Sequence, residues 1–214
     1  MGVGLDGTKY RVRAQGVFGV LGGGGGIGCG SEWRFGMYNE ETMTRLDGLI
    51  RDVPDFPVEG VVYKDFTPLL GDAGALALSV ELMANPYRGK GIDLVVGAES
   101  RGFIFGIAIA QALSAGFVPV RKPGKLPRAV HRAEYALEYG TDVLEIHQDA
   151  LGSGARVLMV DDLLATGGTM EAACGLVAKT GAVIEAVVVL IELEFLKGRE
   201  RLTDFGDVHS VLRY

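Results

Sequence analysis

Two adjacent carboxylates, Asp161 and Asp162, stand where an apolar run ends and a short glycine-containing loop begins. The run 157–160 predicts a buried strand, and a helix-forming segment follows the loop. In α/β sheets a connection of this kind, at the carboxyl end of a strand, binds phosphate through main-chain N–H groups. The two acids can accept hydrogen bonds from vicinal sugar hydroxyls. The segment therefore predicts a ligand with both a phosphate and a ribose diol.

The loop after the two acids is suited to a phosphate. It consists of Ala165, Thr166, Gly167, Gly168 and Thr169. The glycines permit main-chain angles and a close approach that side chains would block, and the threonine hydroxyls add donors. A tight turn capped by threonine would explain the glycines, but not two like charges side by side.

A second loop, Glu99, Ser100 and Arg101, follows a predicted strand at 93–97 and precedes a strongly apolar helix, expected to be buried, at 103–115. Parallel strands present such loops at one sheet edge, so Arg101 is expected near the two acids. An arginine at a helix start is unfavourable against the helix dipole, which favours an anionic ligand as its partner.

A third loop is basic and contains Arg121, Lys122 and Lys125 among glycine and prolines. Beside the other two loops it indicates counter-charge for a polyanion such as pyrophosphate, and its composition is typical of a mobile lid. Glu138 follows in the sequence between apolar and aromatic residues, where its pKa could be raised for proton transfer. Taken by itself, Glu138 is better explained as a solvent-facing hairpin residue.

The elements that must position these residues alternate between strands and helices, which predicts a mostly parallel α/β sheet. Proline at position 86 stops one predicted helix. The other expected elements are helices at 41–52, 73–84 and 170–179, an extended segment at 60–65, strands at 117–120 and 183–191, and a hairpin at 134–146.

The composition excludes several classes of function. A net charge of −6 argues against a general nucleic-acid surface, and no apolar run is long enough to predict a membrane span. Two cysteines cannot form a zinc site alone, and we expect a reduced, cytoplasmic protein without an export signal. Residues 1–38 are glycine-rich and are predicted to be a disordered extension, with one functional domain at 39–214. We reject the dinucleotide-like spacing of Gly23, Gly25 and Gly28, because it lies in a glycine run that no suitable helix follows.

With these loops in place, the chain resembles the type I phosphoribosyltransferases, most closely those that act on adenine, from about Asp52 to the C-terminus. The resemblance rests on the sequences PDFP at 54–57, GVVYKD at 60–65, ESRGF at 99–103, RK at 121–122, GKLP at 124–127, LEYG at 137–140, the segment 157–170, and LKGRE at 196–200. It implies a type I phosphoribosyltransferase fold: a mostly parallel sheet flanked by helices, with a small hood and a flexible catalytic loop.

The resemblance also implies a reaction. Adenine and 5-phosphoribosyl 1-pyrophosphate (PRPP) would give AMP and pyrophosphate in purine salvage. Mg²⁺ would reach the site with PRPP, so no direct protein ligand of the metal is predicted. A cytoplasmic homodimer is implied, with neither nucleic acid nor membrane as a partner.

Residue roles follow from the same resemblance. Loop 165–169 would bind the 5′-phosphate, and Asp161 and Asp162 the ribose hydroxyls. Glu99, Ser100 and Arg101 would form the pyrophosphate loop, with a cis peptide after Glu99 and a catalytic role for Arg101. Glu138 would be the catalytic group near the purine N7. The residues around pyrophosphate would be Arg121, Lys122 and Lys125. The residues around adenine would be Val62, Tyr63, Lys64 and Leu193, with Tyr63 stacking on the base.

Two alternatives remain open. One is a phosphoribosyltransferase for a 6-oxopurine, but such enzymes usually carry an aspartate at the position of Ala165, so the methyl group here favours adenine. The other is a regulator that senses the phosphoribosyl ligand without catalysis. A regulator would be expected to add a basic nucleic-acid-binding segment and to lose catalytic positions, whereas Glu138 is retained. Family members often have phenylalanine and arginine at the positions of Tyr63 and Lys64, which leaves base binding open to change.

Overall fold

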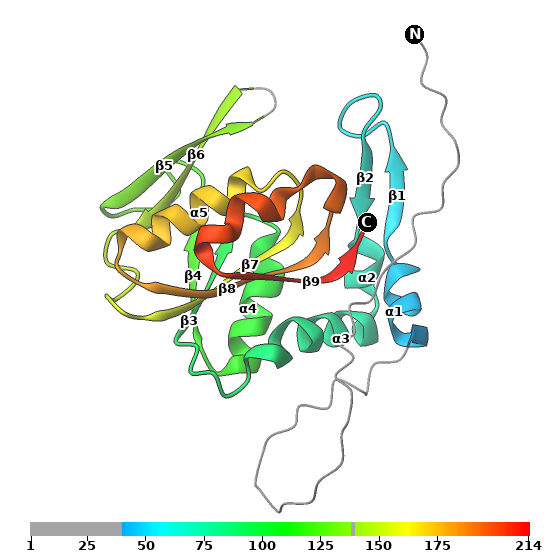
Figure 1. The fold of residues 1–214 in the computed structure, drawn as a ribbon, viewed down its shortest axis with the longest axis horizontal. Coiled ribbons are helices and arrows are strands. Elements are labelled where there is room, and N and C mark those ends of the chain that lie inside the picture. Colours follow the sequence, from blue (N-terminus) through cyan, green and yellow to red (C-terminus); the bar gives the residue numbers. More distant parts are fainter. Residues whose placement is uncertain (1–39, 138–139) are drawn as a thin grey trace, which may run out of the picture.

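The computed structural model describes residues 40–137 and 140–214 (Figure 1). The predicted extension at 1–38 and the predicted catalytic group Glu138 lie outside the described residues. Among the residues described, no helix has the length and apolar character needed to cross a membrane.

The centre of the molecule is the five-stranded sheet that the alternating pattern predicts, with strand order β4-β3-β7-β8-β9. Every neighbouring pair in it is parallel. The strands are β3 (Leu94–Ala98), β4 (Gly116–Val120), β7 (Arg156–Leu164), β8 (Val183–Glu192) and β9 (Asp207–Arg213).

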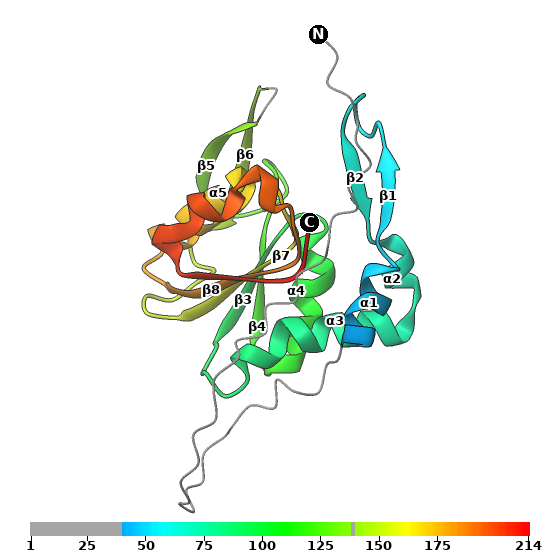
Figure 2. The same ribbon diagram turned by 45° about the vertical axis from the view of Figure 1, so that its right-hand side comes forward.

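Helices cover both faces of this sheet (Figures 1 and 2). Helices α3 (Ala73–Ala84) and α4 (Gly102–Leu113) pack with one face, and α5 (Gly168–Lys179) packs with the other. Successive residues of β7 point into the two hydrophobic cores on either face of the sheet. Leu158 lies in the core with α3 and α4, and Met159 lies in the core with α5. Since both faces are buried, the strand has the continuous apolar sequence expected of a parallel sheet.

Two antiparallel hairpins lie on either side of the sheet (Figures 1 and 2). Strands β1 (Arg51–Pro54) and β2 (Val62–Asp65) form one, which we call the hood. Strands β5 (Val130–Leu137) and β6 (Gly140–His147) form the other. The remaining elements are α1 (Glu40–Asp47), α2 (Thr67–Gly71), η2 (Asn85–Tyr87), η3 (Glu194–Leu196) and η4 (Gly198–Phe205).

Two expectations about single elements were wrong in part. The helix predicted at 41–52 ends at Asp47, and Arg51–Pro54 forms β1, because pairing with β2 outweighs the helical spacing of its apolar residues. Helix α4, expected to be buried throughout, exposes 40% of Ile104 and 49% of Ile107. The helix predicted at 73–84 is confirmed as α3, with Asp72 accepting a hydrogen bond from Ala75 N at its start.

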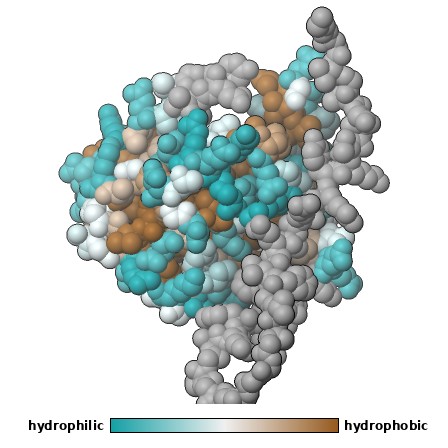
Figure 3. Space-filling model, viewed as in Figure 1, coloured by the Kyte–Doolittle hydropathy of each residue, from teal (hydrophilic) through white to brown (hydrophobic). Residues whose placement is uncertain are grey.

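The hood carries exposed apolar surface, visible at the upper right of Figure 3. Phe56 is 52% exposed and Val62 is 51% exposed. The Phe56 ring packs edge-on against Tyr63, with 5.2 Å between ring centroids. This surface is suited to a flat, weakly polar ligand such as a purine base.

Candidate active site

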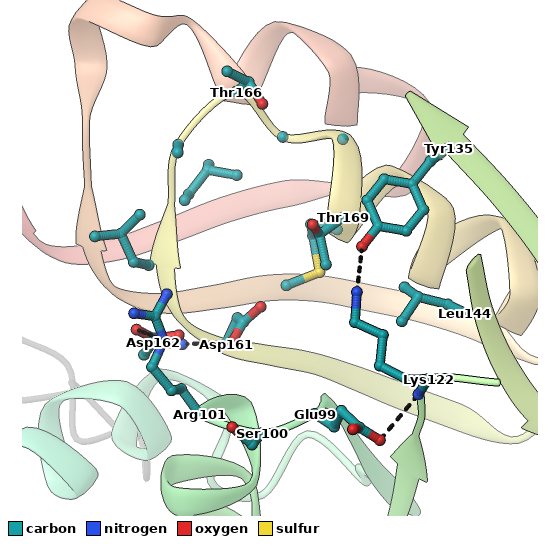
Figure 4. Close-up of a pocket in the computed structure, with 16 residues that line it drawn as sticks. Glu99, Ser100, Arg101, Lys122, Tyr135, Leu144, Asp161, Asp162, Thr166 and Thr169 are labelled. Atoms are coloured by element: carbon teal, nitrogen blue, oxygen red, sulfur yellow. Dashed lines mark hydrogen bonds and ion pairs between the residues drawn. The ribbon is translucent and has the colours of Figure 1, made fainter. Parts of the chain in front are cut away.

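A cavity of about 360 Å³ lies at the carboxyl ends of β3 and β7 (Figure 4). These strands are neighbours, with Val96 opposite Met159, so the loops after them open on the same sheet edge. The structure brings together these predicted site residues around the cavity: Glu99, Ser100, Arg101, Lys122, Asp161, Asp162, Ala165, Thr166, Gly167, Gly168 and Thr169.

The predicted phosphate loop connects β7 to the start of α5, so that its main-chain N–H groups lie at a helix N-terminus. Gly167 has a φ of 84°, a left-handed conformation that favours glycine. A side chain on Gly167 would also meet Gly198 of η4, whose carbonyl oxygen would lie 2.6 Å from the added carbon. The main chain of the loop is therefore packed tightly against the main chain of the 196–200 segment.

The two carboxylates at the end of β7 are held differently. Asp162 is 2% exposed, and its Oδ2 lies 3.1 Å from Arg101 Nε. Asp161 faces the cavity, and its Oδ1 accepts a hydrogen bond of 2.9 Å from Asp162 N. Burial, together with the neighbouring charge of Asp162, raises the pKa of Asp161 well above its ordinary value. Gly102 leaves room for this carboxylate, since a Cβ there would lie 2.9 Å from Asp161 Oδ1.

The loop after β3 contains the cis peptide bond between Glu99 and Ser100 that the family resemblance implies. Glu99 Oε2 accepts hydrogen bonds from Arg121 Nε at 2.5 Å and from Lys122 N at 2.9 Å. Burial opposes the ionisation of Glu99, but these hydrogen bonds and the charges of Arg121 and Lys125 together lower its pKa. Glu99 thus ties the start of the basic loop to the cavity.

Each cation that faces the cavity has an acidic partner in this structure. Arg101 pairs with Asp162, and the Lys122 ammonium pairs with Asp142 of β6. Lys122 Nζ also lies 3.3 Å from the Tyr135 hydroxyl, as Figure 4 shows. Burial opposes the charge of Lys122, but its bonds to Asp142 and Tyr135 raise its pKa overall. An entering polyanion must therefore compete with carboxylates of the protein.

Known proteins share this architecture. Residues 72–208 match the family model of the phosphoribosyl transferase domain. An adenine phosphoribosyltransferase from Roseiflexus sp. RS-1 is 54% identical over 80% of this chain and 99% of its own length. One from Nitrosococcus oceani is 53% identical over 80% of this chain and its whole length.

The chain belongs to the adenine phosphoribosyltransferase family.

Solved structures agree with this assignment and with the predicted type I fold. The crystal structure of the family member from Thermoanaerobacter pseudethanolicus is 48% identical, covers 81% of this chain and all of its own, and has a TM-score of 0.78. The Saccharomyces cerevisiae member, crystallised with an imino-altritol bisphosphate and adenine, is 39% identical with a TM-score of 0.75, and the match covers 79% of this chain and 98% of that one.

The residues predicted to surround adenine in this chain are not among the residues that line the cavity. Tyr63, on the hood, accepts a hydrogen bond from Arg101 Nη1 through its hydroxyl oxygen, so the hood is linked to the loop after β3. The Leu193 main-chain N–H donates to Leu164 O at 2.9 Å, so Leu193 lies next to the last residue of β7. The predicted site residues that do not line the cavity are Val62, Tyr63, Lys64, Leu193, Arg121 and Lys125.

Lys64 differs most from its expected place. Its ammonium pairs with Asp52 Oδ1 at 2.6 Å and lies 3.9 Å from the centre of the Tyr214 ring. Neighbouring residues of a strand point to opposite faces, so Lys64 and Val62 point away from the face on which Tyr63 meets Arg101. If Tyr63 stacks on the base, Val62 and Lys64 can reach it only through their main chain.

Several lining residues were missed from the sequence: Tyr135, Leu144, Leu163, Leu164 and Met170. The three at the ends of the phosphate segment could have been found from their adjacency to it. Tyr135 had no such signal, because it reaches the cavity only through the packing of β5 against α5 and the pairing of Tyr135 with Asp142.

Proposed function

We propose that this protein transfers the 5-phosphoribosyl group from PRPP to adenine, releasing AMP and pyrophosphate. The observation that carries the proposal is a cavity at which the predicted phosphate loop, two adjacent carboxylates and the cations Arg101 and Lys122 meet. The names of the relatives, half of whose residues are identical to this chain, support adenine as the base.

The arrangement supports a dissociative transfer. Loop 165–169 would hold the 5′-phosphate, and Asp161 and Asp162 would hold the ribose hydroxyls near the developing positive charge of the sugar. Arg101 and Lys122 would exchange their carboxylate partners for the departing pyrophosphate and stabilise its charge. Arg121 and Lys125 lie on the same basic loop and would contribute from its outer side.

Base selection would depend on Ala165, at the start of the phosphate loop, and on the hood. Ala165 presents a methyl group where an aspartate would accept a proton from a 6-oxopurine. The Tyr63 ring, supported by Phe56, would stack on adenine, and Leu193 would close the pocket from behind. Glu138 would exchange a proton with the purine near N7 as N9 attacks the sugar.

Mg²⁺ fits this site as a partner of PRPP. Within the described residues no cluster of three or more potential ligands could hold a metal alone. Asp162 Oδ2 is buried, however, and has no partner with hydrogen-bond geometry. This oxygen and those of Asp161 are the hard ligands that Mg²⁺ prefers, and the ion would supply charge neutralisation on the pyrophosphate.

We further propose a cytoplasmic homodimer whose catalytic unit is residues 39–214. The exposed Ile104 and Ile107 on α4 support the dimer, since they form an apolar helix surface next to the pyrophosphate loop.

The central test is an assay of the purified protein with PRPP, Mg²⁺ and one base at a time. We expect AMP and pyrophosphate to form from adenine, with hypoxanthine and guanine at least about 100-fold slower in kcat/KM, because the pocket offers no partner to their 6-oxo form. Turnover of hypoxanthine or guanine but not adenine would contradict the base assignment. Binding of PRPP without turnover of any base would favour the regulator.

A Glu138→Ala variant is expected to lose most of its turnover while still binding PRPP. Proton transfer by a positioned side chain contributes about 10²- to 10⁴-fold, so kcat should fall by roughly that factor. The measurement is steady-state kinetics together with calorimetric titration of PRPP. The variant Glu134→Ala, on the same hairpin, is the matched control, and an unchanged kcat in Glu138→Ala would remove the catalytic role.

A further inference from the structure

Glu145, on β6, is a buried carboxylate that the proposed chemistry does not use. It is 1% exposed. A charge in such a place is costly unless it is paired and hydrogen-bonded, so its partners indicate what the residue is for. Its Oε1 lies 2.6 Å from Arg132 Nε on the neighbouring strand β5. Its Oε2 accepts a hydrogen bond of 3.0 Å from Gly124 N, in the middle of the basic loop.

The main chain of Glu145 also holds that loop. Arg121 N donates to Glu145 O at 2.9 Å, and Glu145 N donates to Arg121 O at 2.7 Å. This antiparallel bridge lies on the edge of β6 opposite β5, because on its other edge Glu145 pairs with Arg132. One residue therefore fixes two points of the basic loop, Arg121 by its main chain and Gly124 by its side chain.

Lys122 lies between these two fixed points. Gly124 has a φ of 75°, so the chain turns sharply there. Lys122 N is held separately by Glu99, and its ammonium enters the cavity between Asp142 and Tyr135. Asp142 and Glu145 are three residues apart on β6 and point to opposite faces of the strand, so the loop is held from both faces.

The interactions that hold the basic loop through Asp142 and through Glu145 differ in whether a ligand can replace them. The pair between Lys122 and Asp142 lies in the cavity, where pyrophosphate could replace the carboxylate. The hydrogen bond between Glu145 and Gly124 is part-buried and lies outside the cavity lining, so a ligand in the cavity does not compete for it. Glu145 is thus the fixed anchor, and Asp142 the exchangeable partner.

We propose that Glu145 is a positioning residue that holds the 121–124 turn so that Lys122 points into the cavity toward the pyrophosphate group. The proposal rests on the proposed function in one respect, namely that Lys122 binds pyrophosphate.

The test replaces Glu145 by glutamine, which keeps the shape but can accept only one of the two hydrogen bonds. We expect the Kd of magnesium pyrophosphate, measured by calorimetry, and the KM for PRPP to rise about tenfold, as expected for a lost hydrogen bond to a charged group. The KM for adenine should stay within about twofold, a split that a general loss of structure would not produce.

Asp149→Asn is the matched control, because Asp149 pairs with Arg128 at the other end of the same loop while both side chains are exposed, by 60% and 63%. An exposed pair contributes little, so its pyrophosphate Kd should equal that of the wild type. If Glu145→Gln does not fold, Arg132→Gln, at a 66% exposed arginine side chain, serves instead and should weaken pyrophosphate binding in the same direction.

The positioning role would be overturned if folded Glu145→Gln bound pyrophosphate with the wild-type Kd. The same result in Arg132→Gln would overturn it where that variant is used instead. An equal loss for adenine and PRPP would also overturn it. Wild-type protein that binds no pyrophosphate and turns over no base would instead contradict the proposed function, so the two failures are distinguishable.

Discussion

An Asp161→Asn variant is expected to melt at a higher temperature than the wild type at pH 8 while losing most of its activity. Burial and the charge of Asp162 raise the pKa of Asp161 in the folded protein. Over the pH range between the unfolded and folded pKa values, the folded state holds a proton that the unfolded state has released, so stability falls as pH rises through it. Asparagine removes this penalty, and its Oδ1 can still accept the hydrogen bond from Asp162 N.

The expected rise in Tm follows from the free energy that the substitution recovers. About 1 kcal/mol of relief would raise Tm by roughly 2–4 °C in a domain of this size. The difference in Tm between variant and wild type should shrink toward pH 4, where Asp161 is protonated in the folded protein. Turnover should fall by about 10²-fold or more, because a group that stabilises the transition-state charge is lost.

Differential scanning calorimetry without ligand, at several pH values, measures the stability effect, and the adenine assay measures the catalytic one. Asp204→Asn, at an exposed aspartate of η4, is the control and should change neither quantity. A lower Tm for Asp161→Asn at pH 8 would contradict the raised pKa, and full activity would contradict its place at the ribose.

Gly198→Ala is expected to raise the KM for PRPP by about 10- to 100-fold. An added methyl group there would overlap the carbonyl oxygen of Ala165 and lie 2.9 Å from Gly167 N. Both atoms belong to main chain, so the phosphate loop itself would have to move. A displacement of about 1 Å in a positioning element can cost about 10²-fold in rate.

Gly175→Ala is the matched control, since a Cβ at this position of α5 meets nothing within 4 Å. That variant should keep its kinetics and gain up to about 1 kcal/mol, because alanine favours helix over glycine. Steady-state kinetics in both substrates, with Tm as a check on folding, measure the effect. A KM for PRPP that Gly198→Ala leaves unchanged would show that the 196–200 segment does not support the loop.

The sequence predicted the half of the site that is built from contiguous residues. The phosphate loop and the pair Asp161–Asp162 lie in one segment, and the parallel sheet requires the loop after β3 to lie beside it. The contribution of Tyr135, the anchoring by Glu145 and the link from Tyr63 to Arg101 could not be predicted in this way. They depend on how two hairpins pack against the sheet, and no local pattern encodes that packing.

The strand β1 shows the same limit in the fold. The apolar spacing before it predicts a helix at 41–52, but Arg51 pairs with Asp65 and Asp52 pairs with Lys64. For Arg51 and Asp52 the partners on β2, Asp65 and Lys64, decided the outcome, as is common for strands. In contrast, helix α3 is bounded by signals within its own sequence, Asp72 at its start and Pro86 just after its end.

The parallel order of the sheet has a consequence for synthesis on the ribosome. Strand β3 emerges long before β7, its neighbour in the folded protein, and until then β4 is its only partner among the described strands of the sheet. The nascent chain can therefore build α3, α4 and the loop after β3 before Asp162, the ion-pair partner of Arg101, has been synthesised. A ligand of the cavity can stabilise the folded state only after β7 and the start of α5 have left the ribosome, since both contribute lining residues.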